Sequence, residues 1–539
     1  MQKASLYLLS ALTLCLAFVG FAGVRGANPP AVALSGHQNA VTQQAVEAKD
    51  QPQTVAEKSN FKATSRFQEV VDFCNQLAKT SPLIRQGVLG TTTEGRKLPL
   101  LILADPPVAT PEEARKSGKL VIYVQGNIHA GEVDAKEALL MLAREIVSTP
   151  HPALLKNLIL VIAPIFNADG NERFSRTNRP GQLGPEEGMG VRTNAQGFDL
   201  NRDFVKLESP EVRALVRFIN QWDPAVVIDG HTTDGSLHRY VMTYEGPRCL
   251  AGDQDIVKFT RDVFFPAVGK KLEKATGFHS FFYGNFTRDK AAWETVPGTP
   301  RYGIHYVGLH NRVGILSESY SYASYKDRIV GGREFFRAIF EYCAGHKDEM
   351  QAMLKKAREQ TVQAGKDLKP TDMVAVRQKS TPMVAKTMLE GYEDGATRRV
   401  PGKPKDYPLY YYGLEQPVVS VRRPGIYLIR PGFDKAIETL QRHGLDVEVL
   451  REDVDLNVEA YKVAKITRAE RAFQGHRIVG LDVTSATADR KIPAGTFVIK
   501  TAQPLGDLAV YLLEPQCEDG LAAWNFFDAG LEKDSEFPV

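Results

Sequence analysis

Residues 119–132 read KLVIYVQGNIHAGE, in which an uninterrupted apolar run leads directly to His129 and Glu132. Runs of Val, Ile and Leu without polar alternation are typical of strands that are buried on both faces. Three further runs have this pattern and also lead to polar residues: NLILVIAPIFN to Asn167, PAVVIDG to His231 and VGILS to Glu318. Because open α/β sheets bind ligands outside the carboxyl ends of their strands, we expect these residues to line one crevice.

Helical patterns alternate with these strands. The segment after Glu132 has amphipathic spacing to about Val147, and the segment 209–222 begins with Ser209 as N-cap and Pro210 at the first helical position. Residues 85–105 indicate two strands around a turn at Glu94-Gly95. We therefore predict an α/β fold with a mixed, largely parallel central sheet flanked by helices.

His129, Glu132 and His231 supply two imidazoles and one carboxylate, which leaves one tetrahedral position of a bound ion free. This composition is typical of catalytic zinc sites, whereas structural zinc sites are closed and usually rich in thiolates. Either histidine alone would be interpreted as an ordinary turn residue. Together, at the ends of neighbouring strands, the three residues predict one Zn²⁺ per chain.

Glu318, at the end of VGILSE, is the candidate general base, because attack by water needs a proton acceptor beside the metal. The alternative is a glutamate that faces solvent or caps a helix. A cation would stabilise the oxyanion formed by attack, and the loop GVRTNAQGFDLNRDF (190–204) offers Arg192 and Arg202. Arg202, with Asn201 beside it, would also suit a substrate carboxylate.

The histidine ligands also need carboxylate partners. A metal-bound histidine usually donates its other ring N–H to a carboxylate. Asp199 is well suited to this position, and Asp169, Asp229 and Asp234 are alternatives that the sequence leaves open.

Five motifs together resemble those of the zinc carboxypeptidases related to carboxypeptidase A: HAGE (129–132), NADGNE (167–172), GVRTNAQGFDLNRDF, DGHTTDG (229–235) and GILSES (314–319). The segment TTTEGRKLPLLIL (91–103) is similar to the strand turn that precedes the metal motif in that family. The resemblance covers about residues 65–345. It implies a carboxypeptidase-like fold, the metal ligands His129, Glu132 and His231, and Asp199 behind the first histidine.

The same resemblance implies the remaining roles. Glu318 would be the base, Arg192 the oxyanion donor, and Asn201 with Arg202 the site for the terminal carboxylate of a substrate. The family has a mobile tyrosine that covers bound substrate, and we assign that role to Tyr306 rather than Tyr302. The residue that sets side-chain preference cannot be aligned across RDKAAWETVPGTPRYG (288–303), and NRPGQLGPEEGMG (178–190) is predicted to be a loop at the rim.

The chain has 539 residues, of which 43% are hydrophobic and 24% charged, with a net charge of +3. This length favours two domains, and the absence of a dense Lys/Arg cluster gives no indication of a nucleic-acid partner. A long helix near residues 335–365 is expected to close the first domain. We predict the following order: a signal peptide (1–26), a flexible linker (27–60), a catalytic domain (61–365), a boundary segment (366–410) and a smaller α+β domain (411–539).

The N-terminus predicts export to the periplasm or the cell exterior. Lys3 precedes an apolar stretch from about Leu6 to Val24, and small residues would allow cleavage near Gly26–Ala27. The alternative is an uncleaved membrane anchor, because the stretch approaches spanning length. Export permits disulfides, but buried free thiols are an equal alternative for the remaining cysteines, Cys74, Cys249, Cys343 and Cys517.

The last domain contains no concentration of catalytic residues. GIYLIRPGFDKAIETLQRHGLDVEVL (425–450) predicts strand, helix and strand, while GTFVIKT (495–501) and LAVYLLEP (508–515) predict further strands. His443 and His476 are isolated and are interpreted as surface or packing residues.

Three functions are compatible with these residues. The first is a zinc carboxypeptidase that acts on peptides with a free C-terminal carboxylate. The second is a zinc amidohydrolase that deacylates small N-acyl amino acids or acts on cell-wall peptides, although the large C-terminal domain disfavours it. The third is a peptide-binding protein without catalysis, which would have no need of Glu318.

Overall fold

The computed structural model describes residues 51–233 and 235–539. The predicted signal peptide, residues 27–50 of the predicted linker, and Asp234 lie outside the described residues. No helix among the described residues is long and apolar enough to cross a membrane. The four cysteines after the N-terminal segment are buried free thiols, so the second of the two alternatives applies to them.

Within the described residues, the largest sheet has eight strands in the order β1-β2-β4-β3-β5-β10-β6-β7. Strands β3, β4, β5 and β10 are parallel to one another, and antiparallel pairs attach β2 to β4 and β6 to β10. The predicted mixed, largely parallel sheet is therefore confirmed. Its strands are β1 (Ile84–Thr91), β2 (Lys97–Leu103), β3 (Leu120–Gly126), β4 (Leu158–Ala163), β5 (Val226–Thr233), β6 (Met242–Glu245), β7 (Ser280–Phe282) and β10 (Val313–Tyr320).

The four apolar runs form the centre of this sheet. Every residue of β3, β4, β5 and β10 is buried, as expected for strands that are covered on both faces. Gly126 of β3 lies opposite Gly230 of β5, and His231 lies opposite Glu318 of β10. This register brings the carboxyl ends of three strands to the same edge of the sheet.

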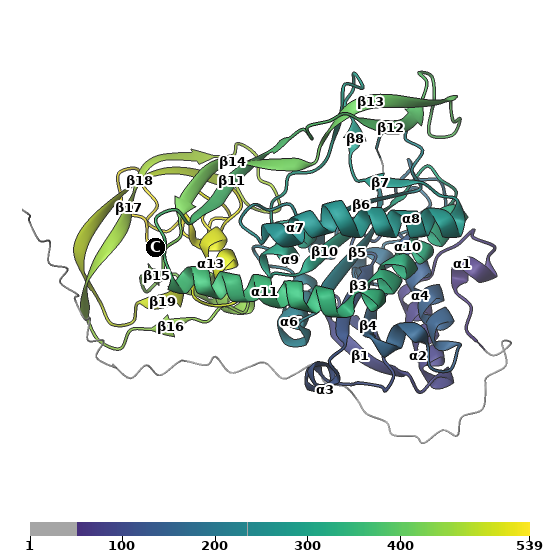
Figure 1. Ribbon diagram of the computed structural model, residues 1–539, viewed down its shortest axis with the longest axis horizontal. Helices are drawn as coiled ribbons and strands as arrows, with labels where there is room; N and C mark the ends of the chain where they lie inside the picture. The colour runs from purple at the N-terminus through teal and green to yellow at the C-terminus, as the bar shows by residue number, and fades with distance from the viewer. Residues whose placement is uncertain (1–50, 234) are drawn as a thin grey trace, which may run out of the picture.

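Helices cover the sheet, and α4 and α10 pack against each other over its central strands (Figure 1). Helix α6 begins as predicted, with Ser209 Oγ accepting a hydrogen bond from the Val212 N–H and Pro210 in the first turn. The helices of this part are α1 (Val55–Lys58), α2 (Phe67–Thr80), α3 (Pro111–Ser117), α4 (Asp134–Val147), α5 (Ala168–Glu172), α6 (Pro210–Trp222), α7 (Gln254–Phe259), α8 (Phe265–Thr276), α9 (Gly303–Leu309), α10 (Tyr325–Gly345) and α11 (Lys347–Lys366).

Two predictions about segments at the edges of the first domain are wrong. Residues 51–60, predicted as part of a linker, contain α1, which Thr54 caps and which an ion pair between Glu57 and Arg144 of α4 holds at 2.6 Å. A helix of four residues is too short to show a period in the sequence. The single long helix predicted near 335–365 is two helices, α10 and α11, which are separated at His346.

The predicted boundary at 366–410 is also wrong, because the segment forms strands β11 (Met373–Thr381), β12 (Thr387–Tyr392) and the start of β13 (Pro404–Tyr412). Strand β13 pairs with β9 (Ala292–Glu294), which in turn pairs with β8 (Asn285–Phe286). Trp293 packs there with Leu389, Leu409 and Tyr411 in a second small core. Prolines within 366–410 indicate a linker in the sequence, but Pro404 begins β13 and Pro408 lies within it.

The C-terminal part lies beside the main sheet and is drawn in light green to yellow in Figure 1. The predicted strand–helix–strand unit is confirmed as β15 (Ile426–Ile429), α12 (Asp434–Arg442) and β16 (Glu448–Val449). LAVYLLEP is not a strand but α13 (Gly506–Leu513), which is buried on all sides and therefore has no diagnostic period. The other strands are β14 (Leu414–Arg422), β17 (Val454–Arg468), β18 (Val479–Ile492) and the confirmed β19 (Phe497–Lys500).

Candidate metal centre and active site

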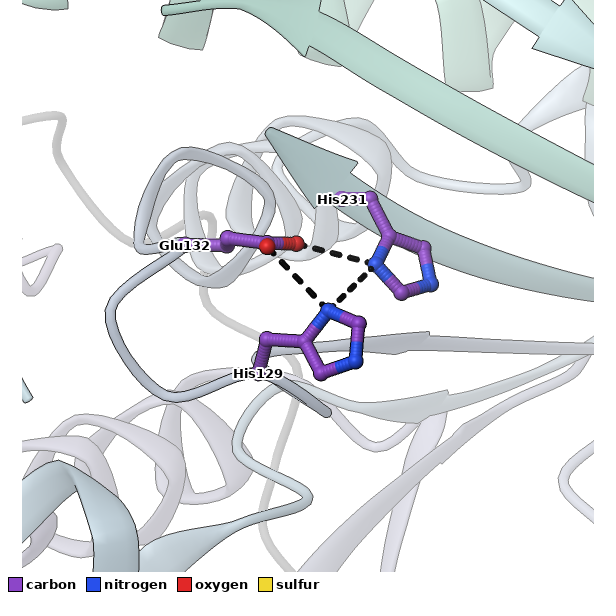
Figure 2. Close-up of side chains that lie close together, drawn as sticks. All are labelled: His129, Glu132 and His231. Atoms are coloured by element: carbon purple, nitrogen blue, oxygen red, sulfur yellow. Dashed lines mark hydrogen bonds and ion pairs between the residues drawn. The ribbon is translucent and has the colours of Figure 1, made fainter. Parts of the chain in front are cut away.

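Three buried side chains converge at the carboxyl edge of the sheet. His129 and Glu132 lie in the turn between β3 and α4, and His231 lies near the end of β5. One ligand atom from each residue lies within 4.8 Å of the others, and Figure 2 shows them facing a common point. The structure thus brings together the three residues that the sequence singled out as ligands.

The distances among these atoms suit a tetrahedral ion. Glu132 Oε1 lies 3.1 Å from His129 Nδ1, Glu132 Oε2 lies 2.9 Å from His231 Nδ1, and the two Nδ1 atoms are 3.1 Å apart. Ligand atoms about 2.0–2.1 Å from a tetrahedral Zn²⁺ would be roughly 3.3 Å apart. Two imidazoles and a carboxylate are also the donor types that zinc prefers, so the residues fit this ion.

Each histidine is held from behind by a carboxylate. His129 Nε2 lies 2.9 Å from Asp199 Oδ1, and His231 Nε2 lies 2.9 Å from Asp229 Oδ2. If each Nε2 donates its hydrogen, the Nδ1 lone pairs of the two rings point at each other. That arrangement is unfavourable unless a cation lies between them, which supports metal binding.

The carboxylates of the cluster favour positive charge beside them. Burial works against the charged form of Glu132, but His129, Arg179 and hydrogen bonds from both histidines hold its pKa well below the usual range. Burial likewise opposes protonation of His231, yet Asp229 and Glu132 raise its pKa well above normal. The site therefore attracts positive charge at this point.

Of the alternative partners for a histidine, Asp199 and Asp229 serve one ring each. Asp169 lies elsewhere, where it accepts hydrogen bonds from Thr92 Oγ1 at 2.7 Å and the Glu94 N–H at 2.9 Å. From the sequence, Asp229 was considered only as an alternative to Asp199 for the carboxylate partner of a histidine. Asp229 lies two residues before His231 on the same strand, so both side chains lie on one face. This spacing could have indicated Asp229 as the partner of His231.

Glu318 lies next to this cluster at the end of β10 and lines the same pocket as the three candidate ligands. Burial, together with the charge of Glu132, raises its pKa to about 8, although His231 and Arg192 act in the opposite direction. Within the described part of the chain, its Oε2 atom has no hydrogen-bond partner. A carboxyl group with a free oxygen beside a metal centre can accept a proton, and a bound cation would lower its pKa.

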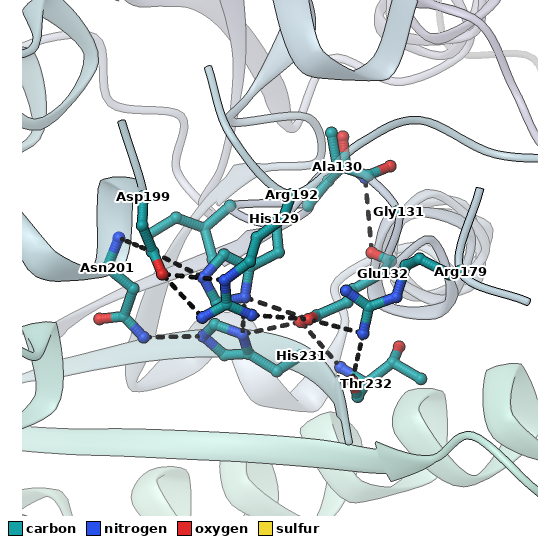
Figure 3. A network of polar contacts seen from close by, with 12 residues as sticks. His129, Ala130, Gly131, Glu132, Arg179, Arg192, Asp199, Asn201, His231 and Thr232 are labelled. Atoms are coloured by element: carbon teal, nitrogen blue, oxygen red, sulfur yellow. Dashed lines mark hydrogen bonds and ion pairs between the residues drawn. The ribbon is translucent and has the colours of Figure 1, made fainter. Parts of the chain in front are cut away.

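Arg192 lies between two acidic groups of the site, as Figure 3 shows. Its Nε and Nη2 atoms bind Asp199 Oδ2 at 2.9 and 2.8 Å, and its Nη1 atom lies 3.7 Å from Glu132 Oε1. The guanidinium group is partly exposed and lines the pocket. It thus offers positive charge beside the candidate metal centre.

Asn201 and Arg202 follow Asp199 in a short 3-10 turn, η3 (Leu200–Arg202), and both line the pocket. The Asn201 side chain accepts a hydrogen bond from the Gly303 N–H at 2.9 Å and approaches His231 Nε2 at 3.4 Å. The guanidinium of Arg202 stacks on the ring of Tyr302 at 4.1 Å. This contact joins the loop 190–204 to the N-terminus of α9.

The assignment of Tyr306 to the substrate site is wrong. Tyr306 is fully buried, and its hydroxyl bonds His443 Nδ1 at 2.7 Å on the side of the C-terminal part. Tyr302 and Tyr283 line the pocket instead. Tyr302 is the N-cap residue of α9 and Tyr306 lies one turn inside the helix, so only packing distinguishes which of them faces the site. His443 is a buried packing residue, in agreement with one of the two interpretations offered for it.

Arg179 is a further residue of the site, and its place there was not predicted from the sequence. Its Nη2 atom lies 3.0 Å from Glu132 Oε1 and donates to the Thr232 carbonyl at 3.2 Å (Figure 3). Arg179 belongs to the Gly/Pro-rich loop that was predicted at the rim. A charged residue in that loop could have indicated a role in the site, but nothing in the sequence tells that Arg179 contacts Glu132.

Comparison with known protein families identifies a match for part of the chain. Residues 70–299 match the family described as zinc carboxypeptidase. This range includes the three candidate ligands, Asn201 and Arg202, but it ends before Glu318.

Curated relatives are carboxypeptidases. The chain is 23% identical over 498 residues to carboxypeptidase 2 of Trichophyton rubrum, a match that spans 88% of this chain and 86% of that one. It is 31% identical over 180 residues to carboxypeptidase D of Mus musculus, which spans 29% of this chain and 13% of that protein.

Among solved structures, carboxypeptidase A from Helicoverpa armigera is 17% identical, with a TM-score of 0.39, over 55% of this chain and 75% of that one. A metallo-carboxypeptidase from Pseudomonas aeruginosa, solved in complex with (2-guanidinoethylmercapto)succinic acid, is 18% identical with a TM-score of 0.38. That match covers 52% of this chain and 69% of the other.

Proposed function

We propose that this metallopeptidase, whose residues 70–299 match the zinc carboxypeptidase family, removes the C-terminal residue from peptides that end in a free carboxylate. The observation that carries the proposal is the convergence of His129, Glu132 and His231 in the same pocket as Glu318 and Arg202. A metal centre, a proton acceptor and a carboxylate-binding cation are the parts that such a reaction needs.

His129, Glu132 and His231 would hold the ion, with Asp199 and Asp229 keeping the two imidazoles oriented. When bound, Zn²⁺ supplies a Lewis acid for the scissile carbonyl and lowers the pKa of a coordinated water. Glu318 takes the proton of the attacking water on its free oxygen and passes it to the leaving amine. Arg192 stabilises the negative charge that develops on the carbonyl oxygen.

Asn201 and Arg202 would bind the terminal carboxylate of the substrate. A guanidinium group offers the planar pair of donors that a carboxylate accepts, and stacking on Tyr302 keeps that plane oriented. Tyr302 and Tyr283 replace Tyr306 as the tyrosines that can contact bound substrate. These roles make the protein an exopeptidase rather than an endopeptidase.

The carboxylate contact is tested with matched peptides. A peptide with a free C-terminus should be cleaved far faster than the same peptide with an amidated C-terminus, because only the former pairs with Arg202. Mass spectrometry of the products measures both rates. Equal cleavage of the two peptides would reject the carboxylate site and favour a zinc amidohydrolase that acts on N-acyl amino acids or cell-wall peptides.

The metal assignment is tested by replacement of one ligand. His231→Ala should lose the single zinc ion that the wild-type chain retains after dialysis, as measured by elemental analysis. His151→Ala is the control, because His151 is an exposed histidine of the same domain whose partner is Asp105. Full zinc retention in His231→Ala would reject this ligand set.

We further propose that the protein is exported, on the basis of the apolar stretch between Lys3 and Gly26. Its size on secretion, measured by intact mass, distinguishes a cleaved signal peptide from an uncleaved membrane anchor.

A further inference from the structure

The turn between β17 and β18, residues 469–478, reaches from the C-terminal part to the back of the candidate active site. The amide oxygen of Gln474 accepts a hydrogen bond from the Asp199 N–H at 2.9 Å, across 275 positions of sequence. The next residue, Gly475, lies against Phe198. The C-terminal part therefore contacts the segment that leads into Asn201 and Arg202.

Asp199 is the junction of that segment. Its carboxylate binds His129 Nε2 and Arg192, and it also accepts a hydrogen bond from the Asn201 N–H at 3.0 Å. Its backbone N–H donates to Gln474, so Asp199 links the C-terminal part to the candidate ligand His129. It also links that part to Asn201 and Arg202, the pair proposed to bind the substrate carboxylate and called the clamp below.

Further contacts hold the other side of the clamp. Arg301, next to Tyr302, pairs with Asp519 at 2.9 Å and lies over the rings of Phe473 and Trp524. Gln474 thus contacts the segment 198–202, and Phe473, Asp519 and Trp524 contact the segment 301–303. The second segment contains Tyr302, on which Arg202 stacks.

The turn is anchored beside these contacts. His476 Nε2 lies 3.0 Å from both carboxylate oxygens of Glu208, and His476 Nδ1 lies 3.0 Å from Asn525 Oδ1. Gln474 has a φ of +51°, which is uncommon for a residue with a side chain. An unfavourable backbone of this kind is retained where surrounding contacts determine it.

We infer that Gln474 is a positioning residue of the active site, and that the β17–β18 turn completes the substrate-carboxylate clamp of the catalytic domain. This inference rests on the proposed function for its consequence in catalysis. It gives the C-terminal part a specific role: to hold the segment 198–202 in the geometry in which Asn201 and Arg202 can bind the end of a peptide.

The test compares two substitutions of similar size. Gln474→Met removes the acceptor but keeps the length of the side chain, whereas Gln474→Glu keeps an acceptor oxygen. Arg471→Ala, on an exposed residue of the same turn, is the control. All variants are made in the full chain with zinc present.

In peptide hydrolysis, Gln474→Met should raise KM about three- to tenfold, the range that the loss of one hydrogen bond produces, with kcat changed much less. Its preference for free over amidated peptide should fall by the same factor, and Gln474→Glu should restore most of it. A uniform loss of kcat in Gln474→Met, or a KM equal to that of Arg471→Ala, would overturn the inference.

Hydrogen exchange gives a readout that does not depend on activity. Amides of residues 198–204 should exchange faster in Gln474→Met than in the wild type, Gln474→Glu or Arg471→Ala. Unchanged exchange in that segment would overturn the positioning role. If the wild type cleaves neither peptide, the proposed function fails, while the exchange experiment still decides whether Gln474 holds the segment.

Discussion

His129 and His231 direct one ring nitrogen toward each other and the other toward a carboxylate. This arrangement is a stronger indication of a metal than the identity of the residues, because two facing lone pairs need a cation or a proton between them. Asp199 and Asp229 make equivalent contacts, one to each ring. Loss of either aspartate is expected to leave its imidazole free to rotate away from the common point.

The role of Glu318 can be separated from that of the ligands. Glu318→Gln keeps the size of the side chain and leaves the three candidate ligands in place, so the variant should retain zinc. It should lose about 10²-fold or more in kcat, since an amide cannot accept the proton of the attacking water. Elemental analysis and steady-state kinetics measure the two effects, and unchanged kcat would remove Glu318 from this role.

Arg179 should act on the metal through Glu132. Its guanidinium lies 3.0 Å from Glu132 Oε1, and Gly131 makes room for it, because a Cβ there would lie 2.3 Å from Arg179 Cδ. Arg179→Gln should weaken zinc binding by about tenfold or more, the effect typical of residues that orient ligands. Competition with a chelator measures the affinity. Arg176→Gln, at an exposed arginine three residues earlier in the chain, is the control, and equal affinity in both variants would contradict the assignment.

The helices and strands that can be predicted from the sequence are those whose residue pattern follows from one local requirement, such as burial on both faces. The strands β3, β4, β5 and β10 were predicted because burial on both faces demands continuous apolar runs. The candidate ligands followed from their places at the ends of such strands. Segments such as α13 were not predictable, because an element that is apolar all round satisfies a strand as well as a helix.

The choice between Tyr302 and Tyr306 failed for a different reason. Tyr302 caps α9 and Tyr306 lies one turn inside it, and the direction of each ring depends on what packs against the helix. The partner that turns Tyr306 inward is His443, which lies 137 positions later in the chain. Contacts of this range, like that between Gln474 and Asp199, have no signature in a single sequence.

The attachment of the β17–β18 turn should depend on pH through His476. Its hydrogen bonds to Glu208 and Asn525 raise the pKa of His476, whereas burial and the charge of Lys206 lower it. The net effect is a raised pKa. A histidine whose pKa is raised on folding stabilises the fold fully below its unfolded value of about 6.5, and this contribution is lost as the pH rises through the folded pKa. The pKa of Glu208 is lowered, so the carboxylate is already charged there.

His476→Gln should therefore destabilise the protein more at pH 6 than at pH 9. Urea unfolding of the variant and the wild type at both values measures the difference. His279→Gln is a suitable control, because His279 pairs with Glu390 on the surface and away from this turn. An equal loss of stability at the two pH values would show that the charge on His476 contributes nothing to the contact.

The part of the chain that holds the candidate active site and the later strands share buried charges. Arg248, which follows β6, binds Glu245 and also Glu415 of β14, and all three side chains are almost completely buried. Burial raises the pKa of Glu245, although Arg248 acts against this shift. A buried cluster of charges is stable only when each charge keeps its partner of opposite sign.

Arg248→Met should therefore lower the free energy of unfolding by about 3 kcal/mol or more, since it leaves two buried carboxyl groups without their cation. Arg422→Met is the matched control: it removes an exposed arginine of β14 that pairs with Glu459, and should cost about 1 kcal/mol or less. Urea unfolding followed by tryptophan fluorescence should detect both parts of the molecule, because Trp222 lies on α6 and Trp524 in the C-terminal segment. If Arg248 joins the two parts, the wild type should unfold in one transition and Arg248→Met in two. A single transition with an unchanged midpoint in Arg248→Met would mean that other contacts, such as those of the β17–β18 turn, couple the two parts.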